Sequence, residues 1–579
     1  MIRALLFFGI VQLLVFSTLL LKSSQHKRSK DKYLNIVNFF FWLSFFLSFC
    51  FGALTLITGT RTPIFFVSFS FFVGLVIVRL RYRNPPIKLI LFSLLIVGCL
   101  VTLASLSITG FHPVGSDPPR FFGFGRRIIV DGNWIPGRYY EPFYGALFPA
   151  LSGYIAMISL VTGLDLLSGV PALIVINLGV ILGISAYISV SNLSGDSRAG
   201  LFGTILAFTT PVLSTLIIFT QNIGYVFYFL FMAILSIYVT RRSMRASLFL
   251  MILVTSVGIQ FHATFSLATM VPVVGLAIFS REKNLPKLKG MALIVSVISL
   301  VYWVYLGILG GIINPAETFL ESFSSILFGG AQISSPASSY FTSSAPSYLA
   351  YAWTFLPALS AALVFSYLIK KKRKRNKGIE IPFYMVAGFL FFAYLISKFV
   401  VGRLSRYLQV AWPVALIGGA IGVYKIYEKW ENNKIITGLI ACLVAFSIFS
   451  AVHSREYSPD VYDGSWPDIG RRPVDWDLAE YMNRTLPEDR RLGFIDRGGN
   501  LHFSPKNTPF TDLSSVFVYF QIGYQTVIYD RYGSLRDRIY LCKERQIEKL
   551  NMNISTIYTG SGNVLIYPHG KDKLSTGSP

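Results

Sequence analysis

Apolar runs long enough to cross a bilayer recur along the chain as far as residue 452. A membrane-spanning helix needs about 20 predominantly apolar residues. By this criterion we expect membrane helices at residues 4–21, 34–58, 63–80, 88–110, 169–190, 199–218, 222–240, 290–310, 348–369, 381–400, 406–424 and 434–452. The apolar stretch 246–280 is interrupted by Gln260 and His262, so we interpret it as two short helices that meet at this polar pair. The pattern therefore predicts a polytopic α-helical membrane protein with about 14 membrane helices.

Lysine and arginine are concentrated in alternate loops between these helices. The basic loops are residues 22–32, 79–88, 196–198, 241–245, 281–289, 370–377 and 425–434. Loops rich in Lys and Arg remain cytoplasmic, so we expect the N-terminus and the region after residue 452 to be extracytoplasmic. The segment 143–163 is also apolar, but a crossing there would move every later basic loop to the other side. We therefore expect it to lie along the membrane surface.

The composition excludes a purely soluble enzyme and disfavours a nucleic-acid partner. Hydrophobic residues make up 53% of the chain and charged residues only 14%, against about 25% charged in a typical soluble domain. A net charge of +24 would suit nucleic acid. However, the excess follows the inside/outside pattern, and even the run KKKRKRNK at 370–377 is typical of contact with anionic membrane lipids. P-loop, GxGxxG, HExxH and GxSxG sites are absent, which disfavours ATP-driven transport and the corresponding hydrolases.

The chain is expected to have three parts: additional membrane helices at 1–87, a membrane module at 88–452 with a long outer loop at 111–168, and an extracytoplasmic domain at 453–579. After residue 453 charges alternate in sign and short strand-like runs appear. These runs are residues 491–496, 515–520, 525–530 and 563–568, and an amphipathic helix is expected at 474–485. We interpret this region as a small α/β domain.

The outer loop 111–168 holds the carboxylate best placed for chemistry. Asp117 follows the fourth predicted span and precedes a helix-like stretch that carries Arg126 and Arg127. A carboxylate at the membrane surface can remove a proton from an acceptor hydroxyl as a general base. The simpler interpretation is an aspartate that caps the next helix, and the residues alone leave both open.

A second polar cluster is expected at the outer end of a later hairpin, where Lys398, Arg403 and Arg406 lie close in sequence. A fork of guanidinium donors matches a phosphate group well. Long basic side chains can also extend from the membrane towards lipid headgroups. The same two interpretations apply to Arg126 and Arg127.

The order of these features resembles the GT-C superfamily of membrane glycosyltransferases, which use polyprenyl-phosphate-linked sugars. The resemblance covers roughly residues 88–453. In the first outer loop it is carried by Asp117, the segment 129–136, the aromatic-proline stretch 140–144 and the expected interfacial helix 143–163. Further along it is carried by residues 194–212, His262 within QFHAT, and RLSRY at 403–407 followed by Pro413.

This resemblance implies a GT-C-like fold and an inverting transfer of a hexosyl or pentosyl group. The donor would be a polyprenyl- or dolichyl-phosphate sugar, and the acceptor a glycan, lipid or protein on the extracytoplasmic face of the plasma membrane. Asp117 would be the catalytic residue, with support from His112, Glu141 and His262. The residues implied in binding the donor phosphate are Arg403, Arg406, Tyr407, Lys398, Arg126 and Arg127.

Two departures from the family pattern bear on metal dependence. Asp117 is followed by Pro118 and Pro119 rather than by another acid, an aromatic residue or His, and the second outer turn has Gln221–Asn222 where many members have an acid. A hard divalent cation prefers several carboxylate oxygens, so the sequence leaves a metal cofactor undecided. The alternatives to an enzyme are a lipid-linked sugar flippase or other transporter, and a non-catalytic scaffold. Few ionisable residues lie within the spans, which favours the enzyme.

Overall fold

A computed structural model describes residues 32–58, 63–82, 85–107, 118–133, 149–208, 220–241, 244–262, 286–310 and 412–430, parts of 265–277 and 435–445, and five strands between 491 and 568. The chain divides into two compact units. The first contains residues 1–108, 136–150 and 172–458, and the second contains residues 109–135, 151–171 and 459–579.

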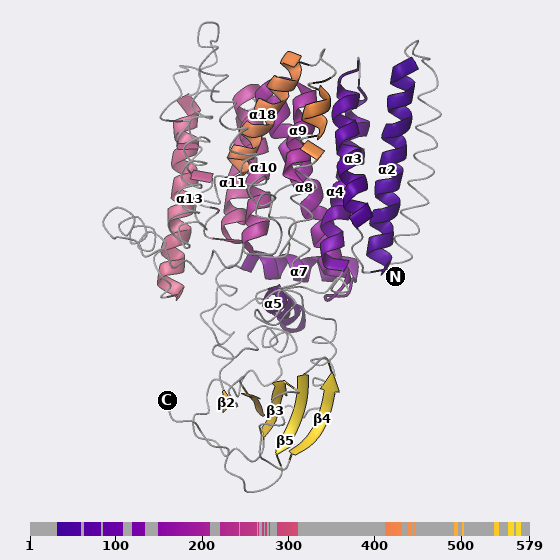
Figure 1. Cartoon of the computed structure of the whole chain (residues 1–579). Coiled ribbons are helices and arrows are strands. Elements are labelled where there is room, and N and C mark those ends of the chain that lie inside the picture. The colour runs from indigo at the N-terminus through magenta and orange to yellow at the C-terminus, as the bar shows by residue number, and fades with distance from the viewer. Residues whose placement is uncertain are drawn as a thin grey trace, which may run out of the picture. The chain divides into compact units, whose positions relative to one another are not determined.

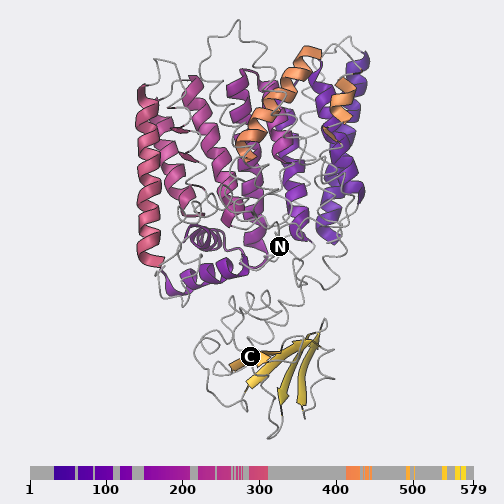
Figure 2. The same ribbon diagram turned by 60° about the vertical axis from the view of Figure 1, so that its left-hand side comes forward.

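The first unit is a bundle of long helices that run side by side in Figures 1 and 2. Its main helices are α2 (Lys32–Thr58), α3 (Pro63–Leu80), α4 (Ile87–Ser107), α8 (Gly169–Ser194), α9 (Ser197–Ala207), α10 (Thr220–Arg241), α11 (Met244–Ile259), α13 (Pro286–Gly310) and α18 (Trp412–Trp430). Within the described part of the chain, α2, α4, α8 and α10 each contain a stretch long and apolar enough to cross a membrane. This supports a membrane protein.

Most of the expected spans that fall on described residues are helical. The prediction is confirmed for α2, α3, α4, α8, α10 and α13, whose bounds differ from the expected ones by a few residues. Helix α18 (Trp412–Trp430) ends six residues later than expected, residues 406–411 lie outside the described residues, and α9 ends at Ala207. The expected spans 4–21, 348–369 and 381–400 lie outside the described residues, so the count of 14 stays a prediction.

Helices α4 and α8 are antiparallel neighbours. A Cβ atom added at Gly179 of α8 would lie 3.1 Å from the Cys99 sulfur of α4, and one at Gly183 would lie 2.5 Å from a Leu95 methyl carbon. Residue numbers along α8 therefore increase in the direction in which those along α4 decrease. The C-terminal end of α4 and the N-terminal end of α8 consequently lie at the same end of the bundle, as the sequence pattern requires. The interfacial position expected for 143–163 stays a prediction.

The helix ends that border the predicted basic loops are joined by side-chain hydrogen bonds at one end of the bundle. Four bonds connect the helix ends there: Arg79 Nε to Asn38 Oδ1 (2.6 Å), Tyr427 hydroxyl to the Ile77 carbonyl (3.4 Å), Asn192 Nδ2 to Ser236 Oγ (3.2 Å), and Tyr424 hydroxyl to the Asp196 carboxylate. They link α2 to α3, α3 to α18, α8 to α10, and the α8–α9 turn to α18. We call this end of the first unit the basic end.

Small residues allow α8 and α9 to pack closely. A Cβ atom at Gly200 would lie 2.6 Å from the Tyr187 ring, and one at Gly203 would lie 2.8 Å from the Ala186 carbonyl oxygen. Thr204 adds an interhelical hydrogen bond from its hydroxyl to the Gly183 carbonyl (3.0 Å). The two helices thus form one rigid hairpin.

The expected break in the stretch 246–280 is confirmed. Helix α11 ends at Ile259, residues 260–262 form a turn, and the described residues from Phe265 to Ala277 are helical again. The side-chain amide of Gln260 donates to the Ser256 carbonyl (3.1 Å). Phe261 packs on Phe227 of α10 with ring centroids 4.8 Å apart, which anchors the turn to the neighbouring helix.

The second unit contains a five-stranded sheet. Its strands are β1 (Arg491–Ile495), β2 (Leu501–His502), β3 (Arg538–Lys543), β4 (Ile554–Gly560) and β5 (Asn563–Pro568), in the order β2-β1-β3-β5-β4. Strands β1 and β3 are parallel and the other pairs are antiparallel. The strands expected at 491–496 and 563–568 are confirmed. Those expected at 515–520 and 525–530, and the helix at 474–485, lie outside the described residues, so the α/β domain stays a prediction.

Candidate functional site

The described part of the predicted outer loop contains two helices, α5 (Pro118–Asp131) and α7 (Pro149–Thr162). Helix α5 begins at the residue after Asp117. Proline is favoured at the first position of a helix, because it has no N–H to leave unpaired there. Phe121 and Phe122 of α5 are buried, whereas Val130 is 72% exposed. Helix α5 is therefore amphipathic and positions Arg126 and Arg127 on its half-buried part.

Helices α5 and α7 are in contact at Gly125. A Cβ atom there would lie 2.8 Å from a methyl carbon of Ile155 and 3.2 Å from the Ser152 carbonyl oxygen, both on α7. Any larger residue would separate the helices. Away from its buried residues α7 exposes Leu160 and Val161, which are 65% and 79% exposed. Exposed apolar residues on a short helix suit the boundary between lipid and water.

Arg127 is already paired within α5. Its Nε atom lies 2.9 Å from the Asp131 carboxylate, with the two side chains 34% and 17% exposed. This is an ion pair between residues four apart, the spacing that brings side chains together on a helix. An arginine has five N–H donors in a planar fork, and the pair with Asp131 orients this fork in Arg127.

The other predicted site residues fall into two groups. Asp117, His112, Glu141, Lys398, Arg403, Arg406 and Tyr407 lie outside the described residues, and their roles stay predictions. His262 is described: it follows α11 in the first unit, where its Cβ atom is 3.6 Å from the position a Cβ would take at Gly224 of α10. Among the described residues, Arg126 and Arg127 are the only predicted site residues that share an element. No group of three or more potential metal ligands occurs in this part of the chain.

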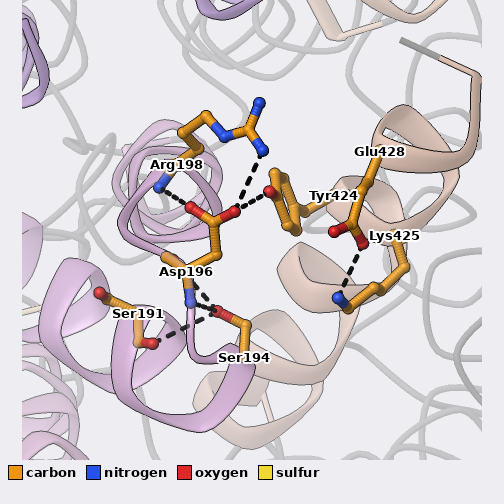
Figure 3. Close-up of polar contacts among 7 residues, drawn as sticks. All are labelled: Ser191, Ser194, Asp196, Arg198, Tyr424, Lys425 and Glu428. Carbon is orange, nitrogen blue, oxygen red and sulfur yellow. Dashed lines mark hydrogen bonds and ion pairs between the residues drawn. The ribbon is translucent and has the colours of Figure 1, made fainter. Parts of the chain in front are cut away.

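The structure reveals a polar cluster at the basic end that sequence reasoning missed (Figure 3). Asp196 is the N-cap of α9, and its carboxylate accepts the backbone N–H of Arg198 (2.8 Å). The same carboxylate lies 3.3 Å from the Arg198 guanidinium and accepts a hydrogen bond from the Tyr424 hydroxyl of α18. Partial burial alone would raise the pKa of Asp196, but the bonds from Tyr424 and Arg198 outweigh it and hold the pKa below its ordinary value.

Aromatic packing reinforces this cluster. The Tyr424 ring lies 5.9 Å from the ring of Phe202 on α9, and the Arg198 guanidinium carbon is 5.8 Å from the Tyr424 ring centroid. On the other side, Lys425 forms an ion pair with Glu428 (2.8 Å). The sequence Ser-Gly-Asp-Ser-Arg at 194–198 signals a helix cap, but Tyr424 could not be found from sequence because it is 228 residues away. We interpret the cluster as a clamp that holds α9 against α18.

Comparison with solved structures returns membrane glycosyltransferases. ArnT from Cupriavidus metallidurans bound to undecaprenyl phosphate matches with 13% identity and a TM-score of 0.47 over 82% of this chain and 97% of that one. The oligosaccharyltransferase AglB from Archaeoglobus fulgidus, in complex with an inhibitory peptide and a dolichol-phosphate, matches with 11% identity and a TM-score of 0.48 over 85% and 75%. The apo form of the Archaeoglobus oligosaccharyltransferase matches with 12% identity and a TM-score of 0.43; the match covers 69% of this chain and 58% of that one.

ArnT and AglB are GT-C glycosyltransferases, the superfamily whose pattern the sequence resembles. No protein-family profile and no curated protein sequence matches the chain.

Proposed function

We propose that this protein is a membrane glycosyltransferase that moves a sugar from a polyprenyl-phosphate donor to an acceptor on the extracytoplasmic face. The observation that carries the proposal is helix α5, which starts directly after Asp117 and bears two half-buried arginines. In the chain this helix lies between α4 and α8, and the end of α4 and the start of α8 lie opposite the basic end. A carboxylate and phosphate-binding groups are thereby combined in one segment on the predicted outer side.

In the proposed reaction Asp117 accepts the proton of an acceptor hydroxyl as the oxygen attacks the anomeric carbon. The bond from this carbon to the phosphate oxygen breaks, and the lipid phosphate leaves with the electron pair. A single displacement of this kind inverts the anomeric configuration. Positioning of the two substrates and stabilisation of charge on the departing phosphate would supply most of the rate.

Arg403 and Arg406 are proposed to hold the donor phosphate, with Lys398 and Tyr407 beside them and Arg126 and Arg127 as further cationic groups. The pair with Asp131 fixes one edge of the Arg127 guanidinium. His112, Glu141 and His262 are proposed as supporting residues.

The test is turnover by purified protein in lipid nanodiscs. A panel of polyprenyl-phosphate sugars is supplied together with a lipid and a glycan acceptor, and the release of lipid phosphate is measured. Asp117→Asn should abolish release while the yield and size-exclusion profile of the protein are unchanged. Glu317→Gln removes one carboxylate from the same predicted face and serves as the matched control.

The results separate the proposed roles. Near-normal release by Asp117→Asn would reject the base. An unchanged apparent donor affinity in Arg406→Ala would reject the phosphate role of that residue. Movement of intact donor across sealed vesicles without release of lipid phosphate would instead identify a flippase.

A further inference from the structure

A groove beside helix α13 contains none of the residues assigned to glycosyl transfer. It has a volume of about 450 Å³ and is lined by Val274, Ala277, Lys289, Ala292, Leu293 and Ser296. The first two belong to the helical residues that end at Ala277, and the others belong to the first turns of α13. A volume of this size falls within the range of about 300–1,000 Å³ that is usual for small-molecule sites.

The groove opens on an apolar face of α13. Leu293 lines the groove and is 65% exposed. Exposed apolar side chains continue along the helix at Val297, Leu300 and Val304, and spacings of four, three and four residues keep them on one face. Among the described helices, α13 lies at one edge of the bundle in both views (Figures 1 and 2). An exposed apolar face of this kind marks contact with membrane lipid.

A positive charge lies at the start of the groove. Lys289 is exposed and precedes Leu293 by four residues, so the two side chains share a face of α13. Lys289 has no ion-pair partner within the part of the chain that the structure describes. The loop 281–289, which ends at this lysine, carries three further cations and is predicted to be cytoplasmic. Basic pockets between membrane helices on the cytoplasmic side bind the head groups of anionic lipids.

We propose that the groove binds one acyl chain of an anionic phospholipid, whose phosphate is held by Lys289. The ammonium group of Lys289 pairs with the phosphate, and the apolar side chains of the groove contact the acyl chain as far as Ser296, about two helical turns further along α13. A lipid in this position bridges the helical residues before Ala277 and α13. The site is separate from the proposed donor site and does not depend on glycosyl transfer.

The test measures lipid retention by the full chain. Wild-type protein is delipidated and returned to nanodiscs that contain equal amounts of phosphatidylcholine and phosphatidylglycerol with the same acyl chains. Native mass spectrometry then identifies the lipids that stay bound, and we expect preferential retention of phosphatidylglycerol. Equal retention of the two lipids would overturn the proposal, and this result does not depend on whether any variant folds.

One pair of variants tests the head group. Lys289→Gln removes the charge at the groove and should weaken retention of phosphatidylglycerol about fivefold, which corresponds to the roughly 1 kcal/mol of one cation near an anionic membrane surface. Retention of phosphatidylcholine should stay the same. Lys88→Gln is the matched control, because it removes an exposed cation at the start of α4 that does not line the groove. Equal losses in the two variants would show that the lipid responds to the overall charge of the predicted cytoplasmic loops, which overturns the site.

A second pair of variants tests the acyl chain. Ser296→Phe fills the groove while Lys289 is kept, and it should also reduce retention of phosphatidylglycerol. Val301→Phe places the same ring at a position of α13 that is 64% exposed and does not line the groove, so it should preserve retention. Unchanged retention in Ser296→Phe would overturn the proposal.

Two further outcomes would assign the groove to another occupant. Preferential retention of undecaprenyl phosphate over phosphatidylglycerol, lost in Ser296→Phe, would make the groove part of the donor site. A dimer mass that is present in the wild type and lost in Ser296→Phe would show that a second copy of the chain covers the groove. Either result would overturn the phospholipid site.

Discussion

The clamp between Asp196 and Tyr424 gives the sharpest prediction for stability. Tyr424→Phe removes one hydroxyl and keeps the ring, so the packing against Phe202 is preserved. Arg198 retains its backbone and guanidinium contacts with Asp196. The substitution therefore isolates the hydrogen bond from α18 to the carboxylate.

The expected loss can be worked out from this geometry. A hydrogen bond to a charged group contributes about 1.5–3 kcal/mol. The Asp196 side chain is 26% exposed and keeps its bonds to Arg198, so water and the remaining donors compensate in part. We expect Tyr424→Phe to lower the free energy of unfolding by about 1–2 kcal/mol, which is a factor of roughly 5–30 in the open population.

Cys99 provides the assay, because it is buried between α4 and α8. In a background where Cys50, Cys442 and Cys542 are replaced by alanine, thiol labelling reports opening of this contact. When opening and closing are fast, the labelling rate follows the open population. Tyr424→Phe should raise the rate by the factor above.

The matched control is Tyr427→Phe. The Tyr427 hydroxyl donates to the Ile77 carbonyl at 3.4 Å, a long bond to a neutral acceptor, so its removal should have a smaller effect. Equal labelling rates for Tyr424→Phe and the parent protein, or a larger effect of Tyr427→Phe, would refute the clamp.

The contribution of the clamp to the free energy of unfolding also depends on pH. Because the pKa of Asp196 is lowered in the folded protein, its contribution is fully present above the ordinary value near 3.8 and is lost as pH falls through the lower folded value. The difference between the parent protein and Tyr424→Phe should be constant from about pH 5 to pH 8 and shrink only in stronger acid. A difference that disappears near neutral pH would contradict this assignment.

Three further predictions follow from packing. Gly125→Ala should separate α5 from α7 and reduce the release of lipid phosphate. Gly153→Ala is the control, because its added Cβ meets no atom within 4 Å, and it should preserve the activity. Equal activities of the two variants would show that the packing of α5 on α7 does not support the site. Tyr228→Phe deletes a buried hydroxyl with no partner among the described residues, so the unfolding midpoint should stay constant or rise, and a clear fall would reveal a partner. Gly200→Ala should cost about 1–3 kcal/mol through overpacking, while Gly290→Ala, in open space on α13, should be neutral or stabilising; thermal unfolding measures both.

The membrane helices were predictable because each apolar run is bounded by charged or turn-forming residues. Helix α8 illustrates this, since its apolar run begins at Gly169 and its loop at Gly195 takes a positive φ of 76° that favours glycine. Helix α18 ends six residues later than expected, because the helix tolerates the charged residues of its last turns. Hydropathy locates the apolar region and does not determine where a helix ends.

Contacts between distant residues were not predictable in the same way. The sequence identifies Asp196 as a helix cap but contains no signal for its bond to Tyr424, and the isolated charge of Arg79 gave no indication of Asn38 as its partner. In the sheet, β2, β3 and β4 were not expected. Strand β2 has only two residues and β4 mixes Ser and Thr with its apolar residues, whereas β3 has a short apolar run comparable to that of β5. For the candidate site, sequence identified the helix after Asp117 and its arginines, whereas the contact at Gly125 and the pair with Asp131 required coordinates.

The clamp has a consequence for biogenesis. Asp196 and Tyr424 are 228 residues apart, and translation proceeds at about 5–20 residues per second. The ribosome therefore needs about 10–50 s to reach Tyr424 after Asp196 has been made. During this interval the α8–α9 hairpin lacks its α18 neighbour, and Phe202 lacks the tyrosine rings that later cover it. Newly inserted chains at this stage should be the ones most dependent on membrane chaperones and most exposed to quality-control proteolysis.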